Sequence, residues 1–172
     1  MKLKFWLLDI NPKIDDDSVE LWLWGIDTAG NRVLVVDRSF VAYFYAVLTD
    51  GADASNVAKE IISSLGSAIV KTQIAERRFF GKPVQAIKIY CKNPKGLEKL
   101  SGQLRRLEGV KDCLEDDIRV SMRYLIDNNV VPCSWLEVEA EEDRSLLGVR
   151  ASKVYAAKSA PKQLEEGIVA PS

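Results

Sequence analysis

The stretch PVQAIKIYCKNPKGLEKLSGQLRRLEG, residues 83–109, changes half-way from the sequence period of a β-strand to that of an α-helix. In its first part Ala86, Lys88 and Tyr90 alternate with apolar residues, which is typical of a strand with one face in a core. The leucines that follow recur every three or four positions up to Gly109, which predicts an amphipathic helix that ends at this glycine.

The residues on either side extend this strand–helix pair into a larger unit. VAYFYAVL (41–48) and SAIVKTQIAER (67–77) have the composition of strands, and SNVAKEIISSLG (55–66) has apolar residues at helical spacing. A short strand is expected at 109–115. The order β-α-β-β-α-β predicts a ferredoxin-like, RNA-recognition-like unit over residues 39–115.

The rest of the chain predicts a second group of strands. They are expected at residues 4–11, 18–27, 32–37, 134–142 and 149–157. The first three, with a DTAGN turn before the third, make residues 1–38 an antiparallel β-meander or open barrel. We therefore predict an α+β protein in which this meander packs with the ferredoxin-like unit. Residues 116–157 close the domain with a helix and a hairpin, and the Pro- and Gly-punctuated residues 158–172 form a linker.

DDIRVSMRYLIDNNVVP (116–132) predicts the closing helix. Asp116 or Asp117 can cap its start, while the paired asparagines and Pro132 can end it. The expected buried stripe comprises Ile118, Met122, Leu125 and Ile126. Arg119 and Arg123 lie one turn apart, and they either form a basic face or pair with Asp116 and Asp127 at the surface.

Composition excludes several classes of protein. The net charge of −1 argues against a nucleic-acid footprint over the whole surface, although the 24 lysines and arginines can cluster locally. Cys91, Cys113 and Cys133 lack the spacing of a zinc site, which predicts reduced thiols. The apolar start MKLKFWLLDI is interrupted by Asp9, and no run of about 18 apolar residues exists. We expect a cytoplasmic protein with no membrane partner.

The sequence contains no recognisable catalytic cluster. Histidine, the commonest general base, is absent, and no Gly-rich phosphate loop or nucleophile motif occurs. The acidic runs 15–17 and 115–117 could hold a hard cation, but solvation explains the first better and helix capping the second. No catalytic residue and no metal ligand are predicted.

The basic residues point to nucleic acid more than to chemistry. ERRFFGKPV (76–84) combines basic and aromatic side chains across a Gly-Lys-Pro turn, a mixture that suits single strands because bases stack and phosphates pair. The DNA-binding residues that we predict are Arg77, Arg78, Phe79, Phe80, Lys82 and Arg119. The alternative is a hairpin with a buried Phe pair and solvated arginines.

Three blocks resemble archaeal family B DNA polymerases, in the same order and spacing. DDIRVSMRYLIDNNVVP (116–132) resembles the segment before their exonuclease domain, through its Asp-Ile and Arg-Tyr-Leu-Ile-Asp sequences and its proline. DRSFVAYFYAVL (37–48) resembles their Asp-Arg-x-Phe-x-Pro-Tyr-x-Tyr-Ala block, and FFGKPVQAIKIY (79–90) their Phe-x-Gly-Lys-Pro block. The resemblance covers roughly residues 1–135.

The resemblance implies that the chain is the N-terminal, template-handling domain of such a DNA polymerase, and that it is not catalytic by itself. The parent would catalyse template-directed DNA synthesis with Mg²⁺, whereas this chain lacks the palm motifs and the first exonuclease motif and takes no cofactor. Its expected partners are single-stranded template DNA and the remaining exonuclease and polymerase domains. We expect an excised fragment or a separately encoded piece, with residues 158–172 leading toward the missing exonuclease domain.

By the same resemblance, six positions line a pocket that captures uracil and other deaminated bases in the template. They are Ile10, Ala42, Leu97, Ser101, Val120 and Arg123. Arg123 matches the family's arginine, whereas Ala42 stands where proline is usual. Val120 replaces a larger aromatic residue and Ser101 a basic one. With smaller walls and one charge fewer, the pocket is expected to hold uracil weakly or not at all.

Two other interpretations remain open from the sequence. One is a free-standing ferredoxin-like module that binds nucleic acid or regulates; an in-frame exonuclease motif after residue 172 would decide against it. The other is a small hydrolase on the same fold, which needs an anion cradle next to the first strand of the unit. TDGADAS (49–55) is not an obvious cradle, and a screen against acyl phosphates and phosphoesters would test this interpretation.

Overall fold

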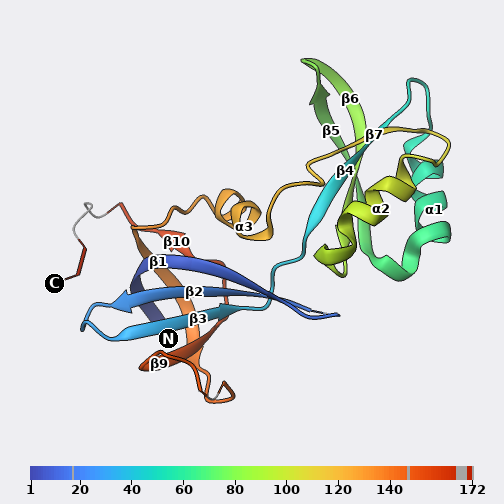
Figure 1. The fold of residues 1–172 in the computed structure, drawn as a ribbon. Coiled ribbons are helices and arrows are strands. Elements are labelled where there is room, and N and C mark those ends of the chain that lie inside the picture. Colours follow the sequence, from blue (N-terminus) through green and yellow to red (C-terminus); the bar gives the residue numbers. More distant parts are fainter. Residues whose placement is uncertain (17, 147, 166–169, 172) are drawn as a thin grey trace. The chain divides into compact units, whose positions relative to one another are not determined.

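The computed structural model of the chain is a mixed α+β protein with two compact units, each built on its own sheet (Figure 1). The structure describes residues 1–16, 18–146, 148–165 and 170–171. Unit 1 comprises Met1–Lys13, Val19–Phe40 and Arg119–Ser172, and unit 2 comprises Ile14–Ser18 and Val41–Ile118. Asp17 of the acidic run and part of the expected linker lie outside the described residues.

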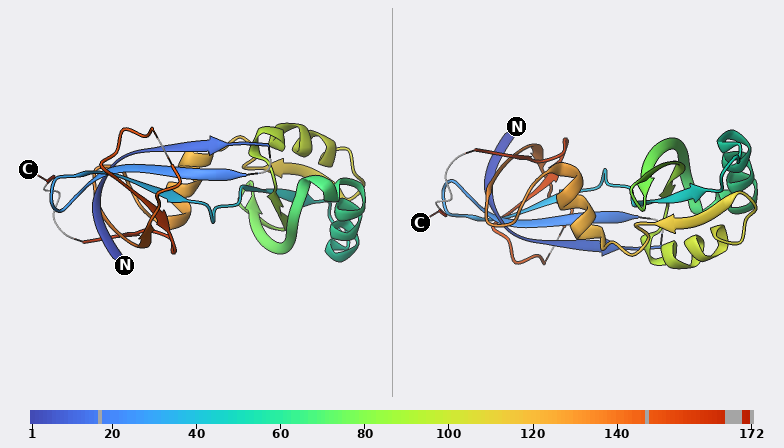
Figure 2. Two further views of the ribbon diagram at one scale, coloured as in Figure 1. Left: turned by 90° about the horizontal axis from the view of Figure 1, so that it is seen from below. Right: turned by 90° about the horizontal axis from the view of Figure 1, so that it is seen from above.

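Unit 1 is built on a six-stranded sheet with the strand order β1-β2-β3-β9-β8-β10. The strands are β1 (Lys2–Ile14), β2 (Val19–Asp27), β3 (Arg32–Asp37), β8 (Trp135–Glu142), β9 (Lys153–Ala157) and β10 (Lys162–Gln163). β1 also pairs with β8, from Lys2 opposite Glu139 to Trp6 opposite Trp135, so the sheet curves round on itself. Figure 2 shows these strands from two further sides. The sheet therefore contains the predicted meander β1–β3 together with β8, β9 and β10 from the C-terminal part of the chain.

The core of unit 1 follows from alternation. Every second residue of β2 from Val19 to Asp27 is buried, as the sequence pattern predicts. β3 pairs with β9 in parallel, with Val33 opposite Lys153. A parallel pair requires a long connection, and here the connection contains Val41–Ile118 of unit 2.

Unit 2 contains strands and helices in the predicted order β-α-β-β-α-β. They are β4 (Tyr43–Leu48), α1 (Ala54–Leu65), β5 (Ile69–Phe79), β6 (Lys82–Cys91), α2 (Leu97–Leu104) and β7 (Val110–Leu114), with 3-10 turns η1 (Gly66–Ala68) and η2 (Pro94–Gly96). The sheet order is β5-β6-β4-β7, and every pairing is antiparallel. Both helices pack on one face of this sheet through the buried residues Phe44, Ala46, Val57, Ile61, Ile87, Ile89, Leu97, Leu100 and Leu104.

Helix α2 is shorter than the predicted helix 95–109. It ends at Leu104, because the backbone then tightens into turns and Gly109 adopts a left-handed φ of 86° that leads into β7. Arg105 stabilises this exit, since its guanidinium donates to Asp112 Oδ1 and Asp116 Oδ2, both at 2.9 Å. The helical leucine pattern therefore continued one turn beyond the helix itself.

The closing helix is α3 (Val120–Asn128), and it differs from the predicted helix in two respects. Its N-cap position is Arg119, without a side-chain cap, so Asp116 and Asp117 do not cap it. Its buried residues are Arg123 and Tyr124, whereas Met122 and Ile126 of the expected stripe are 54% and 58% exposed. The predicted end is confirmed, because Asn129 adopts a left-handed φ of 52°.

Part of the expected linker belongs to the sheet. Lys162 and Gln163 form β10 and pair with Glu137 and Leu136 of β8. The Gln163 side chain also accepts from the backbone N–H of Val131 at 3.1 Å. This segment is therefore attached to unit 1 by both backbone and side chain.

At Gly25 the backbone of β2 lies close against Phe5 and Trp6 of β1. A Cβ atom on Gly25 would lie 2.6 Å from a ring carbon of the fully buried Phe5 and would also overlap the backbone of Trp6. Neither neighbour can move freely, because Phe5 is inside the core and Trp6 is paired with β8. The position therefore requires glycine.

We expect Gly25→Ala to lower the free energy of unfolding by about 2 kcal/mol, because the added methyl overpacks the core. Urea denaturation followed by circular dichroism measures the change. Gly102→Ala is the matched control: a Cβ there meets nothing within 4 Å, and it lies inside α2. This control should raise stability by about 0.5–1 kcal/mol. Equal stability of Gly25→Ala and the unchanged protein would contradict the close approach.

Candidate nucleic-acid interface

Helix α3, which carries predicted site residues, is held by a buried hydrogen bond. The Tyr124 hydroxyl donates to Asp37 Oδ2 at 2.6 Å, and Asp37 is the last residue of β3. Asp37 is 2% exposed, and its carboxylate also accepts from the backbone N–H and the hydroxyl of Ser39. The Phe40 ring meets Tyr124 edge-on, with 5.7 Å between centroids. Burial, and then the charge of Asp37, raise the pKa of Tyr124 above its ordinary value.

The neighbouring Arg38 has a structural role. Its Nε donates to Glu20 Oε1 at 2.7 Å and its Nη1 to Asp143 Oδ2 at 3.1 Å, so it joins β2 to the segment after β8. The hydrogen bond to Glu20 is the main reason that the pKa of Arg38 is raised. The Asp-Arg pair at 37–38 therefore holds unit 1 together through both of its side chains.

The six residues predicted to line a base pocket are divided equally between the two units. Unit 1 contains Ile10 on β1 together with Val120 and Arg123 on α3. Ile10 is buried, Arg123 is 7% exposed and Val120 is half-buried. Arg123 is therefore not a solvated surface arginine.

Unit 2 contains Ala42, Leu97 and Ser101, all of them buried. Leu97 and Ser101 lie one turn apart on α2. The Ser101 hydroxyl donates to Glu98 O at 3.0 Å and accepts from Arg105 Nη1 at 3.3 Å, so its polar groups are already engaged within unit 2. A pocket formed by all six residues stays a prediction.

Five of the six predicted DNA-binding residues lie on the β5–β6 hairpin, and Arg119 lies before α3. Phe80 and Gly81 form the turn with left-handed φ angles of 48° and 78°. Phe80 is 90% exposed and contacts Phe79 edge-on, with 4.6 Å between centroids. The alternative of a buried Phe pair is therefore wrong. Arg78 and Lys82 are exposed beside this turn.

The prediction missed the tyrosines and lysines on the sheet of unit 2. Tyr43 and Tyr45 on β4 and Tyr90 on β6 form a cluster, with 5.8 Å between the centroids of the first two and 5.7 Å between Tyr43 and Tyr90. Lys88 and Arg77 lie over these rings. Strand alternation was the available signal, because it puts the three tyrosines and Lys88 on one side of the sheet.

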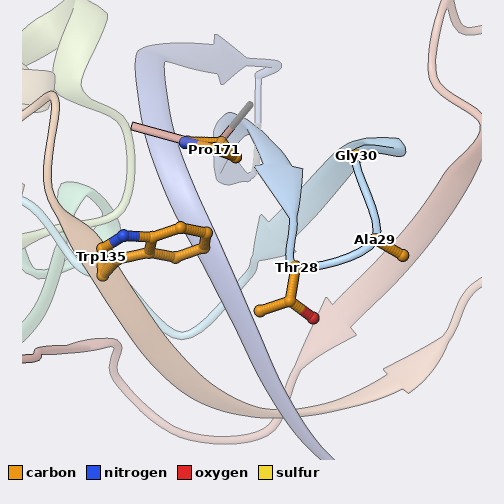
Figure 3. Close-up of a pocket in the computed structure, with 5 residues that line it drawn as sticks. All are labelled: Thr28, Ala29, Gly30, Trp135 and Pro171. Carbon is orange, nitrogen blue, oxygen red and sulfur yellow. The ribbon is translucent and has the colours of Figure 1, made fainter. Parts of the chain in front are cut away.

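Two further features of the described residues concern metal binding and a cavity. No group of three His, Cys, Asp or Glu side chains among them could hold a metal ion. A cavity of about 320 Å³ beside the β2–β3 turn is lined by Thr28, Ala29, Gly30, Trp135 and Pro171, none of them ionisable (Figure 3). No helix in the described part of the chain is long and apolar enough to cross a membrane.

Comparison with known proteins identifies relatives over most of the chain. DNA polymerase 3 of Saccharolobus shibatae is 32% identical over 153 residues, which are 88% of this chain and 19% of that protein. DNA polymerase 2 of Aeropyrum pernix is 33% identical over 156 residues, which are 89% of this chain and 19% of that protein. No family model matches.

A solved structure agrees. The family B DNA polymerase from the hyperthermophilic archaeon Pyrobaculum calidifontis matches 99% of this chain and 21% of its own, with a TM-score of 0.81 and 37% identity. The chain is related to the archaeal family B DNA polymerases. The predicted resemblance is confirmed, and the chain spans about a fifth of the length of these polymerases.

Two of the polymerase-like blocks meet at the buried hydrogen bond. Asp37 and Phe40 come from DRSFVAYFYAVL, and Tyr124 comes from the Arg-Tyr-Leu-Ile-Asp sequence of α3. Residues 87 positions apart are thus brought into contact by the residues that carry the resemblance. In this relative of the polymerases, these two blocks share a structural role.

We expect Tyr124→Phe to lower the free energy of unfolding by about 2 kcal/mol at neutral pH, because a buried carboxylate loses a donor. The raised pKa of Tyr124 gives this effect a pH dependence. The stabilisation that Tyr124 provides is complete below about pH 10, the ordinary pKa of a tyrosine in the unfolded state. It declines at higher pH because this tyrosine ionises first in the unfolded state. Urea denaturation at pH 7 and pH 11 should therefore show a smaller difference between the two proteins at the higher pH. A difference independent of pH would contradict this account.

Proposed function

We propose that the chain is the N-terminal, template-handling domain of a family B DNA polymerase, and that it binds single-stranded template DNA without being catalytic by itself. Homology over about nine-tenths of the chain to a fifth of such polymerases supports this proposal most directly. Its partners would be the template strand and the remaining polymerase domains. We assign no cofactor to this chain, and Mg²⁺ would act in the catalytic domains of the parent.

We also propose that unit 2 is ferredoxin-like. The element order and the antiparallel sheet order β5-β6-β4-β7, with both helices on one face, support this arrangement. A free-standing module of this kind that binds nucleic acid is the second candidate function. The two candidates differ in the expected reading frame after residue 172, where a polymerase would continue into an exonuclease motif.

Strand binding by the β5–β6 hairpin is supported by its exposed side chains. Phe80 offers a solvent-exposed ring, and Arg78 and Lys82 offer exposed cations on either side of it. Rings stack on bases of any sequence, and cations pair with phosphates. This combination would favour single strands, because the bases of a duplex are already stacked.

The base pocket is proposed from the resemblance. Uracil and thymine differ by one methyl group, so the pocket must exclude that methyl with apolar walls while polar groups hold the ring. Ala42 is smaller than the proline usual at this position, and Val120 is smaller than the usual aromatic residue. We therefore propose a weak preference for uracil at most.

The isolated chain should bind a thymidine oligonucleotide weakly at about 0.2 M salt, with a shallow dependence on salt. The double variant Arg78→Gln/Lys82→Gln should make the negative slope of log K against log salt shallower by about 1.4. Each cation that contacts a phosphate of a single strand contributes about 0.7 to the magnitude of this slope. Fluorescence anisotropy measures both. Lys59→Gln/Lys99→Gln, on the helices, removes the same charge and should leave the slope unchanged. A preference for the duplex would contradict the proposal.

A strand with one uracil should bind no more than about ten-fold tighter than the thymine strand, the low end of what a pocket gains from one methyl group. Ala42→Pro should increase this ratio by restoring the wall, and a competition titration measures it. Arg123→Ala should erase the preference if the arginine shapes the pocket, or weaken both strands alike if it only holds the helix. Equal binding of both strands by every variant would mean that this chain has no base pocket.

A further inference from the structure

The face of the unit 2 sheet opposite α1 and α2 is lined by cations that lie on aromatic rings. Phe44, Ile87 and Ile89 point toward the helices, so strand alternation sends Tyr43, Tyr45, Lys88 and Tyr90 to the other side. Lys71 and Arg77 of β5 share this side, since Lys71 pairs with Tyr90 in the ladder. We call these six residues the tyrosine face: Tyr43, Tyr45, Tyr90, Lys71, Arg77 and Lys88.

Each ring of the tyrosine face has a cation against it. Lys88 Nζ lies 3.7 Å from the centroid of Tyr43 and 4.8 Å from that of Tyr90. Lys71 Nζ lies 4.5 Å from the centroid of Tyr90. The Arg77 guanidinium lies 4.3 Å from the centroid of Tyr45 and also donates to its hydroxyl. These contacts hold the positive charges in fixed positions on the sheet.

The two lysines have rings as their partners, not carboxylates. Among the described residues, neither Lys71 nor Lys88 has an acidic group within ion-pair distance. The pKa of Arg77 is raised, mainly by its hydrogen bond to Tyr45 and to a smaller extent by the negative charge of Glu115. Lys71 is exposed, while Lys88 and Tyr90 are half-buried, so both lysines and one ring can be reached from solvent. Tyr43 and Tyr45 are buried beneath.

We propose that the tyrosine face is a second contact surface for a single strand of nucleic acid, in which phosphates pair with Lys71, Lys88 and Arg77 and a base stacks on Tyr90. This inference rests on the proposed function. It adds Lys71, Lys88 and Tyr90 to the hairpin residues already predicted to bind DNA, of which Arg77 is one. In the absence of a strand, Lys71 and Lys88 lie against the Tyr90 ring. A phosphate is a stronger partner for a cation than a ring is, so binding would draw the lysines away and open Tyr90 to a base.

The chemistry of the face favours this occupant over an acidic peptide. A peptide carboxylate could pair with the lysines but would leave the tyrosine ring without a planar partner. A nucleotide supplies both groups, an anion and a ring, in each repeating unit. The combination of charge and ring therefore fits a polymer of nucleotides.

Titrations with two oligonucleotides of equal length test the proposal, one of thymidine and one of abasic sites, which keeps the phosphates and lacks bases. Lys71→Gln/Lys88→Gln should lower the salt slope by about 1.4 on both strands, while Lys59→Gln/Lys99→Gln leaves it unchanged. Tyr90→Leu should lose about ten-fold in affinity for thymidine and nothing for the abasic strand. Tyr90→Phe, which keeps the ring, should bind both strands as the unchanged protein does.

Two results would overturn the tyrosine face while leaving the proposed function intact. One is strand binding by the unchanged chain with the same salt slope in the Lys71→Gln/Lys88→Gln variant. The other is poly-glutamate of matched charge binding as tightly as the thymidine strand, because the rings would then contribute nothing. Failure of the unchanged chain to bind any single strand would overturn this inference and the proposed function together. Circular dichroism of each variant confirms that it is folded.

Discussion

The carboxylate of Asp37 is almost completely removed from solvent, and the arrangement of α3 depends on how it is satisfied. An ionised carboxylate buried without partners costs several kcal/mol, so its donors must be close and well placed. Ser39 supplies two donors from the adjacent turn, and Tyr124 supplies the third from a helix far along the chain. Once Tyr124 points inward, the rotation of α3 is fixed: Arg123 is buried beside it, and Met122 and Ile126 face outward. Exposing about half of two apolar side chains forgoes about 1 kcal/mol each, which together is comparable to the cost of removing one donor from that carboxylate.

Unit 2 uses the two faces of one sheet for different purposes. The face toward the helices is filled by branched and aromatic side chains and provides the core of the unit. The opposite face contains an aromatic cluster whose polar partners are cations, and cation–π contacts replace further apolar packing there. Both faces follow from the period of two along β4 and β6, so a single pattern of residues determines the core and the charged surface together.

The chain corresponds to about a fifth of the length of a family B polymerase. Its candidate contacts are of two kinds under the proposed function. Sequence-independent contacts come from rings and cations on the hairpin and on the tyrosine face, while discrimination between bases depends on the walls of a small pocket. The first kind tolerates change, since any exposed ring stacks. The second does not, because one methyl group decides it. By the resemblance, Ala42, Ser101 and Val120 differ from the residues that are usual in the family.

The sequence by itself determined the order β-α-β-β-α-β, the alternation of β2, the end of α3 at Asn129 and the relation to the polymerases. Each of these depends on residues close together in the chain, through a repeat period, a turn or a block of identities. Other features were decided by the tertiary structure alone. Curvature of the β1–β3 sheet onto β8, the parallel pairing of β9, the outward direction of Met122 and the cations on the tyrosines all require partners from distant segments. The exposure of Phe80 was also decided by the tertiary structure, because it depends on the conformation of the turn between β5 and β6. Local periodicity specifies which side chains share a face, but only the contacts between faces decide which of them is buried.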